Sequence, residues 1–158
     1  MRPSAPPAGP FDVRLAPEAE DNGLANMLAE LLRQNLAARP VARSRCAAML
    51  GRLVLRARDA DVTITLDFRG EVVVVHDGAL PGAHATIEAD SDAIVTMSRL
   101  PLRTRWELPI FNPATGADRE AMAAWRVVIS AHQVHTTVHD YRGYLLLARF
   151  TSILSVGT

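Results

Sequence analysis

Residues 62–89 decide the fold of this chain, and they read VTITLDFRGEVVVVHDGALPGAHATIEA. Apolar and polar side chains alternate from Val62 to Phe68, which predicts a strand with one face on a core and the other in polar surroundings. Arg69-Gly70 predicts a hairpin turn, because glycine accepts the positive φ that such a loop needs. The run from Val72 to Val75 is apolar on both faces, which indicates a central strand covered on both sides.

A third strand and a helix are predicted to follow this pair. Residues 85–89 form the short strand, with alanine and isoleucine side chains on one face. Residues 90–92 (Asp-Ser-Asp) predict the start of the helix, because side-chain oxygens cap free backbone N–H groups and carboxylates suit the positive end of the helix dipole. The helix carries Ile94, Met97 and Leu100 on one side.

Two helices are predicted before this stretch. Residues 21–22 (Asp-Asn) open the first, and an apolar stripe at helical spacing runs from Leu24 to Leu36. Pro40 ends that helix, because the residue before a proline disfavours helical geometry. A short second helix around Cys46 leads into a strand at residues 53–55.

The last third of the chain is predicted to hold a loop, a strand and two helices. The loop at residues 102–117 carries Trp106 and Phe111, so it either closes over the core or lines the mouth of a cavity. Val127 to Ile129 forms a late strand, after a helix that Asp118 caps. The final helix has a broad apolar face between Tyr144 and Leu154, which must pack on the sheet, on a partner or around a ligand.

The composition suits one globular domain. Residues 1–20 are expected to form a flexible Pro-rich tail, since proline fixes φ and removes a backbone donor. Residues 21–158 are expected to form a single domain with its own core. Apolar residues make up 49% of the chain and charged residues 22%, which is ordinary globular composition.

Charge and cysteine content exclude several classes of function. The net charge is zero, so there is no general attraction to nucleic acid. The single Cys46 excludes an internal disulfide and a multi-cysteine zinc site, and it fits a reducing cytoplasm. The chain shows neither a secretory signal nor an apolar run approaching the ~20 residues of a membrane span. We therefore expect a cytoplasmic protein.

The segment from Arg33 to Arg58 contains several arginines and no acidic residue. One interpretation is a patch that binds anionic lipid headgroups. The other is a solvated helix face and an outward strand face whose acidic partners lie elsewhere in the chain. The neutral charge of the whole chain favours the second interpretation.

No motif of catalysis or metal binding is found. The chain lacks a Gly-rich phosphate loop, a G-x-S-x-G elbow and an H-E-x-x-H motif. On a helix, His132, His135 and His139 would share a face that can bind zinc, but the β-branched residues 136–138 favour a strand or turn. We therefore expect no metal, no cofactor and no enzyme activity. A pair of His135 with Asp140 is the remaining candidate for a small hydrolase or isomerase.

Three segments resemble the sterol carrier protein type two family of lipid-binding domains. They read VTITLDFRGEVVVVHDG (62–78), ATIEADSDAIVTMSRLP (85–101) and RVVISAHQVHTTVHDYRGYLLLARFTSILSV (126–156). Members of the family show a strand ending near DF-x-G, a Val-rich strand, a third strand before an acid-capped helix, and a late strand before an apolar C-terminal helix. The sequence departs from the family at Arg126, Ala131 and His132, where many members carry glycines.

The resemblance implies an α+β domain in which helices cover a mostly antiparallel sheet of about five strands and enclose an apolar cavity. It implies non-catalytic binding or transfer of a lipid, such as a sterol, a fatty acid, an acyl-CoA or a phospholipid. By this reading the cavity is lined by apolar residues of the capped helix, the loop and the last two helices: Ile94, Met97, Leu100, Trp106, Phe111, Trp125, Leu146 and Phe150.

A second hypothesis is an accessory or scaffold subunit of an enzyme assembly that handles a hydrophobic intermediate such as an isoprenoid quinone. The apolar C-terminal helix would then form a homodimer or bind an enzyme partner. A transient contact with a membrane surface is compatible with either hypothesis.

Overall fold

The computed structural model describes residues 11–99, 103–105, 108–110, 119–120, 123, 126–127 and 134–154. Its main sheet has six strands in the order β1-β4-β3-β2-β5-β8. The strands are β1 (Asp12–Leu15), β2 (Leu50–Ala57), β3 (Val62–Arg69), β4 (Val72–Asp77), β5 (Ala85–Ala89) and β8 (Val134–Val138). A second sheet pairs β6 (Arg103–Arg105) with β7 (Leu108–Ile110).

The main sheet is mostly antiparallel, as predicted. The pairs β2–β3, β3–β4 and β5–β8 are antiparallel, whereas β1–β4 and β2–β5 are parallel. The β3–β4 hairpin turns at Gly70, whose φ of 78° confirms the predicted need for glycine. The sheet has six strands rather than about five, because β1 was not expected.

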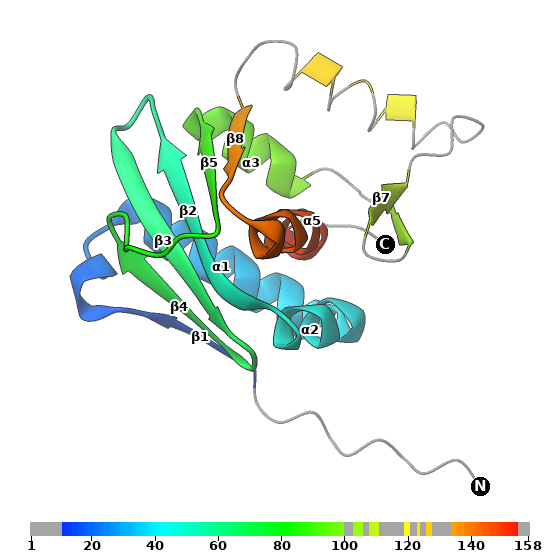
Figure 1. The fold of residues 1–158 in the computed structure, drawn as a ribbon, viewed down its shortest axis with the longest axis horizontal. Coiled ribbons are helices and arrows are strands. Elements are labelled where there is room, and N and C mark those ends of the chain that lie inside the picture. Colours follow the sequence, from blue (N-terminus) through cyan, green and yellow to red (C-terminus); the bar gives the residue numbers. More distant parts are fainter. Residues whose placement is uncertain are drawn as a thin grey trace, which may run out of the picture.

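The helices pack as a layer on one face of this sheet (Figure 1). They are the 3-10 helix η1 (Pro17–Ala19) and the α-helices α1 (Gly23–Ala38), α2 (Pro40–Ala47), α3 (Ser91–Arg99) and α5 (Tyr141–Leu154). The side-chain oxygen of Asn22 accepts hydrogen bonds from the N–H groups of Leu24 and Ala25, which confirms the predicted start of α1. Pro40 begins α2 directly after α1 ends.

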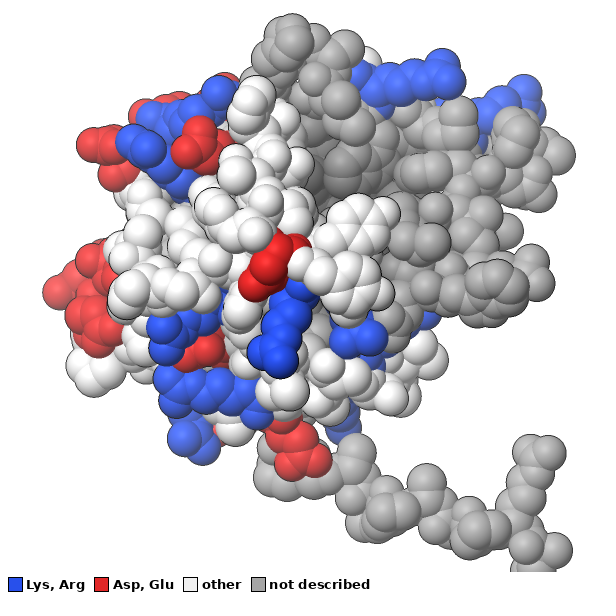
Figure 2. Space-filling model, viewed as in Figure 1, with Lys and Arg blue, Asp and Glu red and all other residues white. Residues whose placement is uncertain are grey.

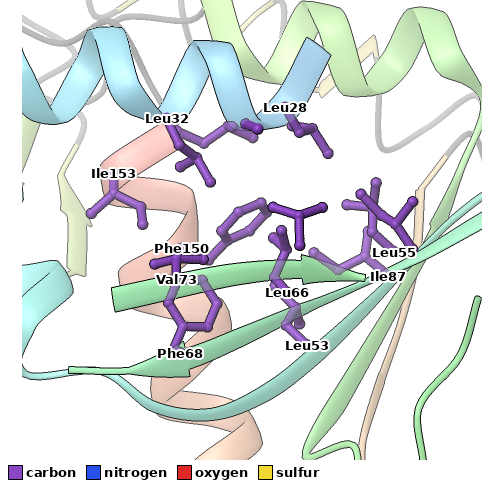
Figure 3. Close-up of a cluster of buried hydrophobic side chains, with 14 of the residues drawn as sticks. Leu28, Leu32, Leu53, Leu55, Leu66, Phe68, Val73, Ile87, Phe150 and Ile153 are labelled. Atoms are coloured by element: carbon purple, nitrogen blue, oxygen red, sulfur yellow. The ribbon is translucent and has the colours of Figure 1, made fainter. Parts of the chain in front are cut away.

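The core lies between the sheet and the helices α1 and α5 (Figure 3). The rings of Phe68 and Phe150 meet edge to face, with centroids 6.4 Å apart and planes at 67°. Leu28 and Leu32 of α1 and Ile153 of α5 are fully buried in the same cluster. Each such side chain stabilises the fold by about 1.5–3 kcal/mol. Packed side chains therefore occupy the described space between the two layers, where the resemblance implies an apolar cavity.

The second face of the sheet is less solvated than the alternating pattern predicts. Thr65 and Asp67 point to this face, yet they are 0% and 6% exposed. The chain after β4 crosses here, since the Thr65 hydroxyl donates to the carbonyl of Gly78 and accepts from the N–H of Leu80. The buried Asp67 carboxylate is paired with an exposed cation, because Arg69, whose side chain is 57% exposed, donates two hydrogen bonds to one carboxylate oxygen at 2.8 and 3.0 Å.

Three local predictions are corrected by the structure. The segment Asp12–Leu15, placed in the flexible tail, is a strand that pairs in parallel with β4, from Asp12 beside Val72 to Leu15 beside Val75. The late strand is Val134–Val138, whereas Val127 is helical. Val72 and Val74 of β4 are only partly buried, so this strand is fully covered on one face alone.

The start of α3 is also capped differently from the prediction. The carboxylate of Asp59, in the turn between β2 and β3, accepts hydrogen bonds from the N–H and the hydroxyl of Ser91 at 2.8 and 2.9 Å. The bond from the Ser91 N–H is the main reason that the pKa of Asp59 lies below its usual value. A distant turn therefore supplies a carboxylate to the first free N–H of the helix.

Candidate functional site

The predicted cavity residues are divided between the core and the part of the chain that the structure does not describe. Ile94, Leu146 and Phe150 are at most 3% exposed and belong to the core cluster. Met97 lies on α3, where the structure describes its backbone but not its side chain. The other four predicted lining residues also lie outside the described residues: Leu100, Trp106, Phe111 and Trp125.

A groove lies between the start of β2 and the outer side of α5. Its volume is about 190 Å³, and it is open to solvent. One wall comes from the junction of α2 with β2 and the other from the first nine residues of α5. The lining residues are Ala48, Met49, Leu50, Arg142, Leu145, Leu146 and Arg149. This groove is the candidate site that the described residues form.

The walls of the groove approach closely because of a glycine and an arginine. Gly51 has a φ of 128°, and an added Cβ would meet the Leu146 side chain at 2.9 Å. At the other end, a guanidinium nitrogen of Arg149 donates a 3.0 Å hydrogen bond to the carbonyl of Ala48. This carbonyl ends α2, where a cation is favourable for the helix dipole. Arg149 therefore links the two walls.

The groove combines apolar contact area with positive charge. Met49 and Leu146 are buried beneath it, whereas Leu50 is 62% exposed at its edge. Arg142 is exposed on the first turn of α5, and Arg149 follows two turns later on the same helix. Since α5 contains no acidic residue, an amphiphile with an anionic head would meet complementary charge here.

Both ends of α5 are held by side chains from elsewhere in the fold. At its start, a carboxylate oxygen of Asp140 accepts the N–H of Gly143, and the other lies 2.6 Å from Nδ1 of His84. At its end, the amide nitrogen of Asn35 donates to the carbonyls of Ile153 and Leu154 at 3.2 and 2.9 Å. The helix that forms one wall of the groove is therefore fixed at both termini.

The pairing of Asp140 with His84 replaces the predicted pair of His135 with Asp140. The hydrogen bond from His84 is the main reason that the pKa of Asp140 lies below its usual value, and the N–H of Gly143 adds to it. His135 is exposed on β8, opposite Glu88. The Asp140 carboxylate, which was one half of the remaining candidate pair for a hydrolase or isomerase, caps a helix.

The three C-terminal histidines do not share a helical face. His135 lies in a strand, as the β-branched neighbours indicated, and Nε2 of His139 is 3.3 Å from the hydroxyl of Thr86. His132 lies outside the described residues. Within the part of the chain that is described, no group of three or more His, Cys, Asp or Glu side chains is placed to hold a metal ion.

Cys46 is a buried thiol inside the core. It is 0% exposed on α2, and burial raises its pKa to about 12. A thiol with such a pKa is protonated at neutral pH and is a poor nucleophile.

The arginine-rich segment is used mainly to join parts of the fold. Four of its arginines lie within 4 Å of a carboxylate: Arg33, Arg52, Arg56 and Arg58. Basic and acidic side chains are interspersed over the surface that Figure 2 shows. For these four residues, the interpretation as a solvated, paired face is the better one.

Sequence reasoning missed most residues of the groove. Leu146 was predicted as a lining residue, but Leu50, Arg142, Leu145 and Arg149 were not singled out. The two walls come from residues far apart in the sequence, so no local pattern joins them. The available signal was the absence of acidic residues from both α2 and α5.

Comparison with solved structures supports a sterol-carrier-like fold for this chain. Among solved structures, the chain is similar to one described as "UbiJ-SCP2 Ubiquinone synthesis protein", with a TM-score of 0.55 and 13% sequence identity. The similarity covers 83% of this chain and 92% of that chain. At this identity it concerns the fold alone. No protein-family model and no curated protein matches the sequence.

None of the described helices has the length and hydropathy that a membrane span requires.

Proposed function

We propose that this chain is a non-catalytic domain that binds a hydrophobic lipid with an anionic head, and that the groove beside α5 receives the head and the first carbons of the tail. The observation that carries this proposal is the position of Arg142 and Arg149 on either side of the apolar residues Leu145 and Leu146. The sterol-carrier-like fold is consistent with it.

The physical basis is desolvation of a hydrocarbon tail together with pairing of the head. Each buried CH₂ group contributes about 0.8 kcal/mol. The volume of about 190 Å³ is below the ~300–1,000 Å³ of most ligand pockets, so the groove suits part of a single-chain lipid. Among the lipids that the resemblance implies, a fatty acid or an acyl-CoA fits this geometry better than a rigid sterol.

The first experiment is native mass spectrometry of freshly purified protein, followed by solvent extraction of whatever it carries. A stoichiometric lipid would support the proposal and identify the head. Protein that is empty and also fails to take up a fluorescent fatty acid would contradict it.

A variant series then tests the groove itself. Arg142→Gln should weaken binding of a fluorescent fatty acid by about 3–10-fold, because a charge-assisted hydrogen bond is lost at an exposed position. The same variant should bind the methyl ester of that fatty acid unchanged. Leu145→Gln should weaken both ligands, since it removes apolar contact area. Arg14→Gln, on the distant strand β1, is the matched control. Equal affinities of Arg142→Gln and Arg14→Gln would place the ligand elsewhere.

A second candidate function is that of an accessory subunit in an enzyme assembly that handles a hydrophobic intermediate, such as an isoprenoid quinone. Two observations favour it: a cluster of buried hydrophobic side chains packs between sheet and helices, and the similar solved structure is described as a ubiquinone synthesis protein. Native mass spectrometry separates the two candidates. An empty chain that is recovered in a defined complex with an enzyme would support the accessory role.

A further inference from the structure

The strand β8 forms an edge of the main sheet and is exposed along most of its length. It pairs with β5 on one side, and no described strand pairs with its other side. His135, Thr136, Thr137 and Val138 are all exposed, and Val138 is 43% exposed. A strand edge of this kind presents unpaired N–H and C=O groups that can pair with another chain.

The hydrogen bonds of β5 define which groups of β8 face outward. The N–H of His139 donates to the carbonyl of His84 at 2.9 Å, so this opposed pair is hydrogen-bonded. Hydrogen-bonded pairs alternate along an antiparallel ladder, so Thr137 and His135 bond to β5 as well. The N–H and C=O groups of Val134, Thr136 and Val138 therefore point away from β5, towards the open edge.

The opposite edge of the sheet is blocked. On β1, the carbonyl of Val13 accepts two hydrogen bonds from the guanidinium of Arg33, at 2.9 and 3.1 Å. The same strand carries the charged pair Asp12 and Arg14. Charged side chains and a capped carbonyl both discourage the addition of another strand. The two edges of this sheet thus differ in their capacity for pairing.

The open edge is complementary to itself. A two-fold axis through Thr136 would place Val134 of one chain opposite Val138 of the other in an antiparallel register. The segment Val134–Val138 carries no Lys, Arg, Asp or Glu, so no like charges would be brought together. Valine and threonine also favour extended backbone.

From these observations we propose that two copies of this chain associate through antiparallel pairing of their β8 strands, forming one continuous sheet across a two-fold axis. The outward N–H and C=O groups of Thr136 form hydrogen bonds with those of Thr136 in the second copy. Val134 of each copy forms the same pair of hydrogen bonds with Val138 of the other. The interface is isologous, so it closes at two copies. None of the residues that line the groove beside α5 belongs to β8.

The test is the oligomeric state of the full chain by light scattering and sedimentation, from about 1 µM to about 1 mM. We expect a reversible rise from the chain mass of 17.2 kDa to twice that value. Thr136→Pro should abolish the rise, because proline removes the outward N–H without removing a bond to β5. Thr136→Val, which keeps the backbone groups, should retain the dimer.

Hydrogen exchange of the native protein gives a second readout. The amides of Val134, Thr136 and Val138 should exchange more slowly as the concentration rises, whereas the amide of Val13 at the blocked edge should not change. A chain that stays monomeric throughout this range overturns the proposal. So does a dimer that survives in a folded Thr136→Pro variant, or an edge that is occupied by a peptide from another protein.

Discussion

Gly143 is the residue on which the position of α5 most directly depends. A Cβ at this position would overlap the carbonyl oxygen of His84, and it would lie 3.3 Å from the side chain of Ala85. The start of α5 therefore lies so close to the backbone before β5 that only glycine fits at position 143.

We predict that Gly143→Ala lowers the free energy of unfolding by about 1–3 kcal/mol, because α5 must move away from the sheet. Urea unfolding at neutral pH measures this change. Gly23→Ala is the matched control, since nothing lies within 4 Å of a Cβ there at the start of α1. Similar unfolding midpoints for the two variants would contradict the role of the close contact.

Asp140 makes the stability of the start of α5 dependent on pH. Its pKa is lowered in the folded chain by the hydrogen bond from His84 and by the N–H of Gly143. The stabilisation is present above the ordinary carboxyl pKa of 3.8 and is lost as the pH falls through the lower folded value. We predict that Asp140→Asn reduces the loss of stability between pH 6 and pH 3, measured by urea unfolding. Asp21→Asn, at an exposed aspartate before α1, should behave like the unchanged chain.

Asn35 connects α1 to the end of α5. Its side chain is 8% exposed, and its amide nitrogen donates to two carbonyls in the last turn of α5. We predict that Asn35→Leu costs about 1–3 kcal/mol, because buried carbonyls lose a donor. Faster hydrogen exchange in the second half of α5 should accompany this loss. Gln34→Leu, on the exposed side of the same helix, is the control, and an equal effect there would rule out the proposed link.

Local patterns in the sequence predicted the strands and helices that carry a strong period. The strand predicted from Val62 to Phe68 and the cap at Asn22 are both confirmed, although the polar face of that strand is buried. The strand Asp12–Leu15 was missed because four residues beside a Pro-rich segment give little periodicity. The late strand was placed too early, at Val127, because a run of β-branched residues does not distinguish a strand from a helix.

The groove depended on tertiary contacts that no local pattern contains. Arg149 reaches the carbonyl of Ala48 only because α5 packs beside the end of α2. The sequence could indicate that both helices lack acidic residues, but it could not indicate that they meet. The same reason explains why the sequence did not indicate the partner of Asp140, since His84 is brought to it by the pairing of β5 with β8.

Most of the buried hydrophobic residues in the described part of the chain form one cluster, which joins both layers. Cys46 belongs to this cluster and is the only cysteine of the chain. We predict that its thiol does not react with a maleimide in the native state at pH 7, because burial raises its pKa to about 12. With increasing urea, the labelled fraction should follow the loss of circular dichroism, as expected of cooperative unfolding. Labelling that clearly precedes this transition would show that α2 opens separately.

The parallel pairing of β1 with β4 imposes an order on the folding of a newly synthesised chain. Asp12 leaves the ribosome well before Val72, its partner in the sheet. The antiparallel pairs β2–β3 and β3–β4 join strands that are neighbours in the sequence, so they can form before β1 pairs with β4. Until β1 docks and Arg33 reaches Val13, the outer side of β4 is an open edge. During this interval the edge of β4 can pair with another chain, so slow docking of β1 would increase the need of a nascent chain for chaperones.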